Sequence, residues 1–332
     1  MLKTPKREDV MKCRIWAASL AAFMIVGTAA LEAQEYPSRV IRAVLPFSPG
    51  GLGDTVIRAI GHGLGKTLGQ GIVVENRPGA GTQIGAQACA AAPPDGYTIC
   101  MLPVDALSYQ PFLTKNLPYD PDKSFEPITA VFYLTEVMVV APATSVATVE
   151  DLIARSKVRP NTLNYATTAT SSVLFFENFK HETGADITKV VYKGGAEAVQ
   201  AMLGGESQVG FFGLGNVVGQ IQSGALRALA VDGLKRSPLL PQVPTLTEAG
   251  YKGAQNRVWF GLFAPAGTPK PVIARLQSEV ERVVREPDFL QKYMDGLGLE
   301  PILNSPQEFA TFLREDRARA ELLVRRSGLQ LQ

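Results

Sequence analysis

Histidine is nearly absent from this chain of 332 residues, which contains only His62 and His181. A metal site built from several imidazoles therefore cannot form, and three scattered cysteines do not replace it. The Gly-x-Ser-x-Gly elbow of serine hydrolases is missing as well. Both histidines fall in predicted helices, where a structural role is favoured over a catalytic one. We predict no metal and no catalytic residue.

Glycine is plentiful, but complete nucleotide-binding motifs are lacking. The segment 61–67 resembles a phosphate-binding loop, yet its outer glycines are one residue too close together and it lies inside a predicted helix. The glycines within 79–85 and 213–219 miss the dinucleotide fingerprint by one position. The sequence therefore predicts no cofactor.

An excess of charge of either sign is also lacking, since 33 Lys and Arg residues face 31 Asp and Glu residues. Removal of residues 1–33 would take away five basic and three acidic residues and leave 28 of each. Without a basic field, neither nucleic acid nor a membrane surface is an expected partner.

The N-terminus has the pattern of a secretory signal. A basic segment ends at Arg14, the uncharged apolar run 15–27 has 13 residues, and small residues follow at 28–30. A stable membrane-spanning helix needs roughly 20 residues, and no later segment is long and apolar enough to be an anchor. We predict a signal peptide over residues 1–33 and export to the periplasm. The alternative, an N-terminal membrane helix, is disfavoured.

Cys89 and Cys100 are the cysteines that remain after residue 33. An oxidising compartment permits them to pair. Their spacing does not require it, and our interpretation favours two buried thiols that act as small apolar residues.

The rest of the chain alternates short apolar runs with longer amphipathic ones, which predicts βα units and a largely parallel sheet. Predicted strands lie at 40–45, 72–75 and 97–102, and a second series of units runs from 137–141 to 226–231. About 300 residues exceed the usual size of one domain. We predict an α/β protein of two domains, each a mostly parallel sheet flanked by helices.

Polar, glycine-rich loops at 47–54, 78–81 and 167–172 follow predicted strands. Ligands of open parallel sheets lie beyond the carboxyl ends of the strands, and helix N-termini there can hold an anion without a formal charge. The loops are therefore candidates to form one binding site. The alternative is that the glycines only permit tight turns and that Asp54 is only a helix cap.

The sequence resembles the Bug-type periplasmic receptors of tripartite tricarboxylate transporters. The similarity includes Pro-Phe-Ser-Pro-Gly-Gly at 46–51, Glu-Asn-Arg-Pro-Gly-Ala-Gly at 75–81 and Trp-Phe-Gly-Leu-Phe-Ala-Pro at 259–265. Further blocks, in the family's order, lie at 36–39, 94–98, 117–120, 192–194, 223–231 and 244–245. Together they span nearly the whole chain after residue 35.

This resemblance implies a Venus-flytrap fold in which the chain visits one domain, crosses to the other and returns. Domain 1 would comprise 34–140 and 264–332, and domain 2 would comprise 141–263. The family pattern implies ligand contacts through backbone amides and waters in the cleft. From domain 1 it implies Phe47, Ser48, Pro49, Gly50, Gly51, Asp54, Gly79, Ala80, Gly81 and Asp105, and from domain 2 Thr167, Thr168, Ser171, Ser172, Tyr192, Gly194, Phe212 and Gly213.

Two departures from the family pattern concern the ligand. The loop at 166–173 is about two residues shorter than usual and has Val173 in place of a histidine. Phe-Phe-Gly at 211–213 replaces Phe-Asp-Asn, so the aspartate suited to an ammonium group is gone. We therefore expect a carboxylate without an amino group, dicarboxylic or with an aromatic body that packs on Phe212. The alternative places Phe212 in the core of domain 2, because strand residues alternate faces.

The predicted function is that of a receptor which captures a small organic carboxylate for the membrane permease subunits of a tripartite transporter. We expect a monomer that performs no chemistry on its ligand. Two alternatives remain: a receptor that signals to a membrane sensor kinase, and a cleft enzyme acting on carboxylates. The enzyme would need a proton-transfer group, for which Asp54, Asp105 and Lys193 are the candidates.

Overall fold

The computed structural model describes residues 36–251 and 257–329. The chain divides into two units, residues 1–38 and 39–332. The predicted signal peptide lies outside the described residues. Within the second unit the secondary structure forms two sheets, and we call each sheet with its helices a lobe.

Lobe 1 comprises residues 39–134 and 258–329 and contains a six-stranded sheet in the order β11-β4-β10-β3-β1-β2. Its central strand β10 is buried along its whole length and carries an unbroken apolar pattern, as expected of a strand covered on both faces. Its strands are β1 (Ile41–Leu45), β2 (Ile72–Asn76), β3 (Thr98–Pro103), β4 (Phe125–Leu134), β10 (Val258–Pro265) and β11 (Leu299–Pro301). Its α-helices are α2 (Leu52–Leu68), α3 (Gln83–Ala90), α4 (Gln110–Leu113), α9 (Lys270–Val284), α10 (Pro287–Phe289) and α11 (Pro306–Ser327).

Lobe 2 comprises residues 136–251 and contains a five-stranded sheet in the order β7-β6-β8-β5-β9. Alternate residues of β5 enter different apolar clusters: Met138 and Val140 on one face, Val137 and Val139 on the other. Its strands are β5 (Glu136–Val140), β6 (Asn164–Thr167), β7 (Thr188–Val191), β8 (Val209–Gly213) and β9 (Arg227–Val231). Its helices are α5 (Val149–Val158), α6 (Thr170–Thr183), α7 (Gly195–Leu203) and α8 (Leu214–Gln222).

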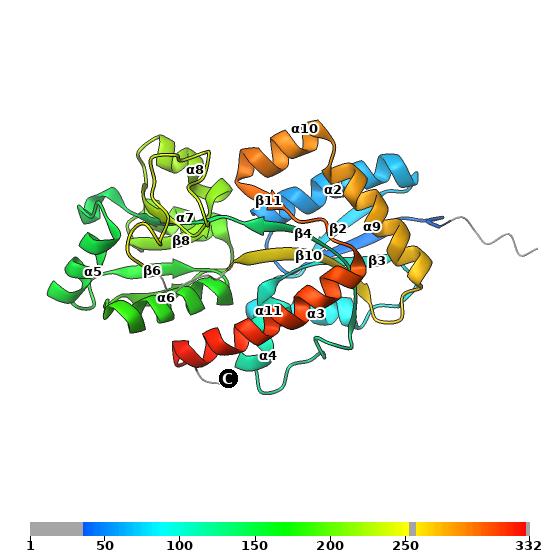
Figure 1. Cartoon of the computed structure of the whole chain (residues 1–332), viewed down its shortest axis with the longest axis horizontal. Helices are drawn as coiled ribbons and strands as arrows, with labels where there is room; N and C mark the ends of the chain where they lie inside the picture. Colours follow the sequence, from blue (N-terminus) through cyan, green and yellow to red (C-terminus); the bar gives the residue numbers. More distant parts are fainter. Residues whose placement is uncertain (1–35, 252–256, 330–332) are drawn as a thin grey trace, which may run out of the picture. The chain divides into compact units, whose positions relative to one another are not determined.

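The α/β prediction is confirmed, but both sheets are mixed and not mostly parallel. In lobe 1, β1 pairs in parallel with β2 and β3, whereas β10 is antiparallel to β3 and β4. In lobe 2, β6 is parallel to β7 and β8, whereas β5 is antiparallel to β8 and β9. Strands β5 and β10, which follow the two crossings between the lobes, run against the direction of the βα units, whereas β4 runs in the same direction as β1, β2 and β3. Figure 1 shows β4 and β10 side by side.

The predicted crossings at 140 and 263 would place β5 in domain 1 and most of β10 in domain 2. In the structure, β5 belongs to the sheet of lobe 2 and β10 to the sheet of lobe 1. Thr135 lies between β4 and β5. Its N–H donates to Gly298 O of lobe 1 (3.3 Å), and its carbonyl accepts from Leu214 N of lobe 2 (2.8 Å). The domain division stays a prediction, and these memberships favour crossings at Thr135 and just before Val258.

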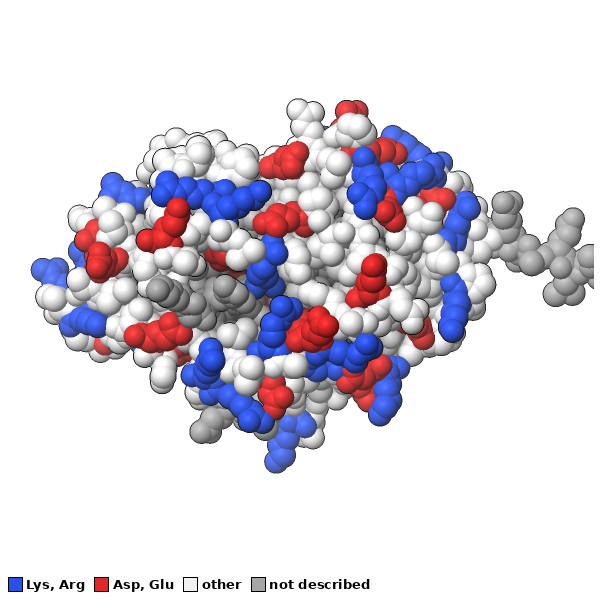
Figure 2. Space-filling view, viewed as in Figure 1, with Lys and Arg blue, Asp and Glu red and all other residues white. Residues whose placement is uncertain are grey.

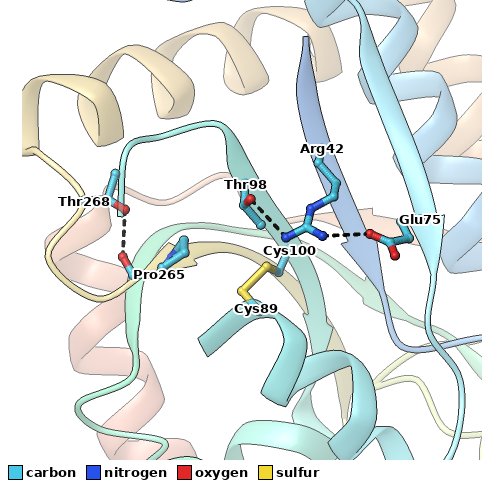
Figure 3. The surroundings of a disulfide bond; sticks show 7 residues. All are labelled: Arg42, Glu75, Cys89, Thr98, Cys100, Pro265 and Thr268. Atoms are coloured by element: carbon cyan, nitrogen blue, oxygen red, sulfur yellow. Dashed lines mark hydrogen bonds and ion pairs between the residues drawn. A yellow bond between two sulfur atoms is a disulfide. The ribbon is translucent and has the colours of Figure 1, made fainter. Parts of the chain in front are cut away.

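Cys89 and Cys100 form a disulfide, which corrects the interpretation of two free thiols. Cys89 lies on the buried face of α3 and Cys100 in β3 (Figure 3). Their Cα atoms are 6.1 Å apart, within the range that a disulfide spans. The spacing along the chain could not show that α3 turns this face toward β3.

Helix α11 is the longest helix of the described chain and packs against α6 of lobe 2 (Figure 1). It begins with a capping box, in which the Ser305 side chain accepts from Glu308 N and the Glu308 carboxylate accepts from Ser305 N. Within residues 36–251 and 257–329, neither this helix nor another combines the length and apolarity needed to cross a membrane. On the face drawn in Figure 2, acidic and basic side chains are interspersed.

Candidate functional site

Two adjoining cavities are lined by both lobes. The inner cavity has a volume of about 90 Å³ and the outer cavity about 500 Å³. They share Phe47, Ser48, Thr168 and Ala169. A larger hollow of about 780 Å³ lies on lobe 2 around the starts of α5 and β9, and none of the predicted site residues lines it.

Four helices begin at the inner cavity. Gly51 precedes α2, Ala169 precedes α6, Gly194 precedes α7 and Gly213 precedes α8, and all four residues line the cavity. None of these residues caps its helix with a side chain. Each helix start carries roughly half a positive charge and N–H groups without a helical partner. The arrangement therefore suits an anion, although no described Lys, Arg or His lines the inner cavity.

Asp54 holds the loop 47–51 in place. Its carboxylate accepts hydrogen bonds from Gly50 N (3.1 Å) and Asn76 Nδ2 (2.9 Å) and forms an ion pair with Arg58 (2.9 Å). Asn76 also donates to Phe47 O (3.0 Å). Burial alone would raise the pKa of Asp54, but the hydrogen bonds from Arg58, Asn76 and Gly50 outweigh it and lower the pKa. Asp54 therefore supports the loop, although it also lines the inner cavity.

Asp105 connects the two lobes. It follows β3 in lobe 1, is only 1% exposed, and accepts a hydrogen bond from Ser171 N at the start of α6 in lobe 2 (2.6 Å). Burial raises the pKa of this carboxyl to about 6, although the hydrogen bond from Ser171 opposes the shift. The start of α6 is thus already occupied by an acidic side chain of the protein itself, whereas α2, α7 and α8 are not capped in this way.

Gln110 makes a second connection between the lobes. Its Nε2 donates to Gly81 O in lobe 1 (2.8 Å) and to Thr170 Oγ1 in lobe 2 (3.1 Å). Gly81 has a φ of +57°, and a Cβ there would lie 2.4 Å from Gln110 Nε2. Glycine is therefore required for this contact. Sequence reasoning missed Gln110, because no motif marks it.

Several polar side chains of the loop at 167–172 form hydrogen bonds within the loop itself. The hydroxyl groups of Thr167 and Ser172 are within hydrogen-bond distance of each other and of Ala169 O, and their two hydrogens are shared among these three contacts. The Tyr192 hydroxyl bonds to Ser207 Oγ (3.0 Å) within lobe 2. Thr168 lines both cavities.

Phe212 lies in an apolar cluster of lobe 2 together with Val139, Ala198 and Met202. A Cβ at Gly210 would lie 2.2 Å from the Phe212 ring, so the ring is folded over that glycine. Its ring therefore packs in the core, as the alternative interpretation expected, although the residue also lines part of the inner cavity. The apolar wall of the inner cavity includes Phe47 and Phe260, whose ring centroids are 5.9 Å apart.

Most of the predicted site residues line one of the two cavities. Pro49 and Gly50 line neither, and Gly50 instead donates to Asp54. The inner cavity is lined by Phe47, Ser48, Gly51, Asp54, Asp105, Thr168, Ser171, Ser172, Gly194, Phe212 and Gly213, and the outer one by Phe47, Ser48, Gly79, Ala80, Gly81, Thr167, Thr168 and Tyr192.

Sequence reasoning missed two polar residues of the inner cavity, Glu136 and Asn216. Glu136 is 5% exposed, and its Oε2 has no hydrogen-bond partner in the described part of the chain. Burial, and then the neighbouring carboxyls of Asp232 and Asp105, raise the pKa of Glu136 well above its usual range. The sequence signal that could have identified Glu136 is its position as an isolated acidic residue at the start of an apolar strand. In residues 36–251 and 257–329, no three His, Cys, Asp or Glu side chains are grouped to hold a metal ion.

Two α/β lobes that enclose a site lined by helix N-termini define the class of two-domain periplasmic binding proteins, and solved structures of that class are similar. The periplasmic binding protein BugD is 33% identical with a TM-score of 0.85, over 90% of this chain and 100% of that one. Rpa4515 from R. palustris with adipate is 30% identical with a TM-score of 0.86 and the same coverage. MatC from Rhodopseudomonas palustris with bound malate is 30% identical with a TM-score of 0.82, over 87% and 100%.

A family model described as the tripartite tricarboxylate transporter family receptor, TctC, matches residues 56–329. The chain belongs to this family of solute-binding receptors, and it has the family's Venus-flytrap type of fold. The predicted family and fold class are thereby confirmed.

Proposed function

We propose that this protein is exported to the periplasm and captures a small organic carboxylate without an amino group, which it delivers to the membrane subunits of a tripartite transporter. The observation that carries the proposal is the convergence of uncapped helix starts on the inner cavity. The starts of α2, α7 and α8 offer N–H groups from both lobes. A carboxylate bound there would be held without a cationic side chain.

The acidic residues at the cavity do not exclude an anionic ligand, because the negative charge of each is either paired or suppressed. Asp54 is paired with Arg58, and Asp105 accepts from the start of α6. Glu136 has a raised pKa, which favours its neutral form. The anion-binding N–H groups of α2, α7 and α8 therefore stay available to a ligand.

A dicarboxylate is favoured over an aromatic acid. The aromatic interpretation depended on Phe212 facing the cleft, and its ring lies in the core of lobe 2. Relatives of similar fold were solved with adipate and with malate, and both are dicarboxylic acids without an amino group. The two adjoining cavities give room for an acid with a carboxylate at each end.

We also propose that the receptor acts as a monomer and releases its ligand unchanged. Two of the three candidates for a proton-transfer group, Asp54 and Asp105, are engaged by Arg58 and by Ser171. Lys193 lines the outer cavity only.

Thermal unfolding in the presence of succinate, malate, adipate, benzoate, aspartate and glutamate tests this function. We expect a dicarboxylate without an amino group to stabilise the protein by about 2.7 kcal/mol at 100 times its dissociation constant. Native mass spectrometry should then recover the same acid with unchanged mass. Selective stabilisation by aspartate or glutamate would contradict the amine-free class, and turnover of the acid would contradict the receptor role.

A further inference from the structure

Glu136 is the first residue of β5 and directly follows the crossing residue Thr135. Its side chain is buried and lines the inner cavity, and Oε2 has no hydrogen-bond partner among the described residues. A buried polar atom without a partner destabilises the folded state, and native proteins rarely keep one without a reason. Because Glu136 lines the inner cavity, a ligand bound there is the candidate partner of this side chain.

Two other carboxyl groups lie near Glu136, and both have hydrogen-bond donors. Asp105 accepts from Ser171 N (2.6 Å), and Asp232 Oδ1 accepts from the backbone N–H of Glu136 (2.8 Å). N–H donors stabilise the ionised form of a carboxyl, whereas burial and like charges favour the protonated form. Burial raises the pKa of Asp232 as well, to about 7, but among the described residues only Glu136 of these three groups has a buried oxygen without a donor, so the protonated form is favoured most strongly at Glu136.

The remaining charged residues around this cluster do not reverse that assignment. Arg257 acts on Asp232 but is paired with Glu300 in lobe 1 (2.5 Å). Asp54, on α2, is paired with Arg58. The polar residues of α6 and α8 that line the inner cavity are Ser171, Ser172 and Asn216, and all three are uncharged.

We propose that Glu136 is a specificity-determining residue of the inner cavity: as a neutral carboxyl group, it donates a hydrogen bond to a carboxylate or hydroxyl oxygen of an amine-free acid. This inference rests on the proposed function, since it requires an acid in the cleft. A carboxyl O–H donates a strong hydrogen bond to a carboxylate. An ionised Glu136 would instead repel the acid and would suit an ammonium group.

Substitution of Glu136 separates these two roles. Glu136→Gln keeps a hydrogen-bond donor and cannot ionise, whereas Glu136→Leu keeps the approximate size without a polar group. Binding of succinate, malate, adipate, benzoate, aspartate and 2-aminoadipate is measured by calorimetry at pH 7 for the wild type and both variants. Glu206→Gln and Glu206→Leu are matched controls, because Glu206 is exposed in the turn between α7 and β8.

We expect Glu136→Gln to bind the amine-free acids within about threefold of the wild-type affinity, and Glu136→Leu to bind them at least about tenfold more weakly. The Glu206 variants should bind as the wild type does. Unchanged affinity in Glu136→Leu, or a large loss in Glu136→Gln together with a preference for the amino acids, would overturn the assignment. If the wild type binds none of the four amine-free acids, the proposed function fails first.

The protonation state of Glu136 has its own readout, which needs no ligand. Infrared difference spectra between the wild type and Glu136→Gln should contain the carbonyl stretch of a protonated carboxyl group at pH 7. A carboxylate band in its place would overturn the assignment even if both variants bind as expected. Because this spectrum is recorded without a ligand, it also distinguishes a failure at Glu136 from a failure of the proposed function.

Discussion

At the scale of single residues, the site is governed by how each carboxyl group is compensated. Asp54 is paired with an arginine, Asp105 accepts from a helix start, and one oxygen of Glu136 has no partner in the described part of the protein. Similar side chains therefore have different tasks in one cavity. Asp54 supports a loop, Asp105 joins the lobes, and Glu136 is left to face a ligand.

Asp105→Asn should change the pH dependence of stability. The pKa of Asp105 is raised from 3.8 to about 6, so between these values the folded state keeps a proton that the unfolded state has lost. The free energy of unfolding of the wild type therefore falls as pH rises through this window. The variant lacks this dependence and should gain up to about 3 kcal/mol over the wild type by pH 7.

Urea unfolding of both proteins between pH 4 and pH 7 measures this difference. Asp288→Asn is the control, because Asp288 is exposed. The prediction is wrong if the stability difference between Asp105→Asn and the wild type is the same across the window.

At the scale of secondary-structure elements, most strands and helices could be predicted from the sequence, and so could the loops that follow β1, β2 and β6, but β4 and β11 were not predicted. Apolar periodicity marks the elements, and the carboxyl ends of parallel strands mark the loops. The pairing of Cys89 with Cys100 could not be predicted, because it depends on which face of α3 meets β3. The sheet to which β10 belongs could not be predicted either, because a continuous apolar run fits the centre of either sheet.

The disulfide should stabilise the link between α3 and β3. Cys89 and Cys100 are 11 residues apart and both are fully buried. Replacing both by alanine should lower the free energy of unfolding by about 2–3 kcal/mol, mainly because the unfolded chain gains freedom. Urea unfolding of the double variant and of the oxidised wild type measures this loss. An unchanged midpoint and slope would contradict the prediction.

At the scale of the whole molecule, the site depends on how closely the lobes approach. Asp105 with Ser171, and Gln110 with Thr170, are residues from different lobes. Sequence patterns describe each lobe separately, so these contacts could not be predicted. The sequence did not identify Glu136 as a site residue for a related reason, because the cavity that it lines is formed by residues from both lobes.

Gly215 should be essential for this approach. A Cβ at Gly215, near the start of α8, would lie 2.8 Å from Leu297 O and 2.8 Å from Leu52 Cδ2, both in lobe 1. Gly215→Ala should therefore disfavour the close approach of the two lobes. Binding of adipate should weaken by roughly tenfold, because part of the binding free energy is then used to bring the lobes together. Small-angle X-ray scattering should show less compaction on adding adipate than in the wild type.

Gly219→Ala is the matched control on the same helix. Outside its own helix backbone, no atom of the described residues lies within 4 Å of a Cβ at Gly219, so this substitution should leave binding and compaction unchanged. Equal behaviour of the two variants would show that the contact at Gly215 does not limit closure.

The helix starts around the inner cavity also bear on how such a receptor changes over evolutionary time. Peptide N–H groups are present whatever the side chain, so most single substitutions leave the anchoring of the anion intact. Side chains such as Glu136 and Asn216 can then vary, and each change alters the part of the ligand that lies beyond the carboxylate. Duplicated copies of one gene can in this way diverge toward different acids without first losing the ability to bind one.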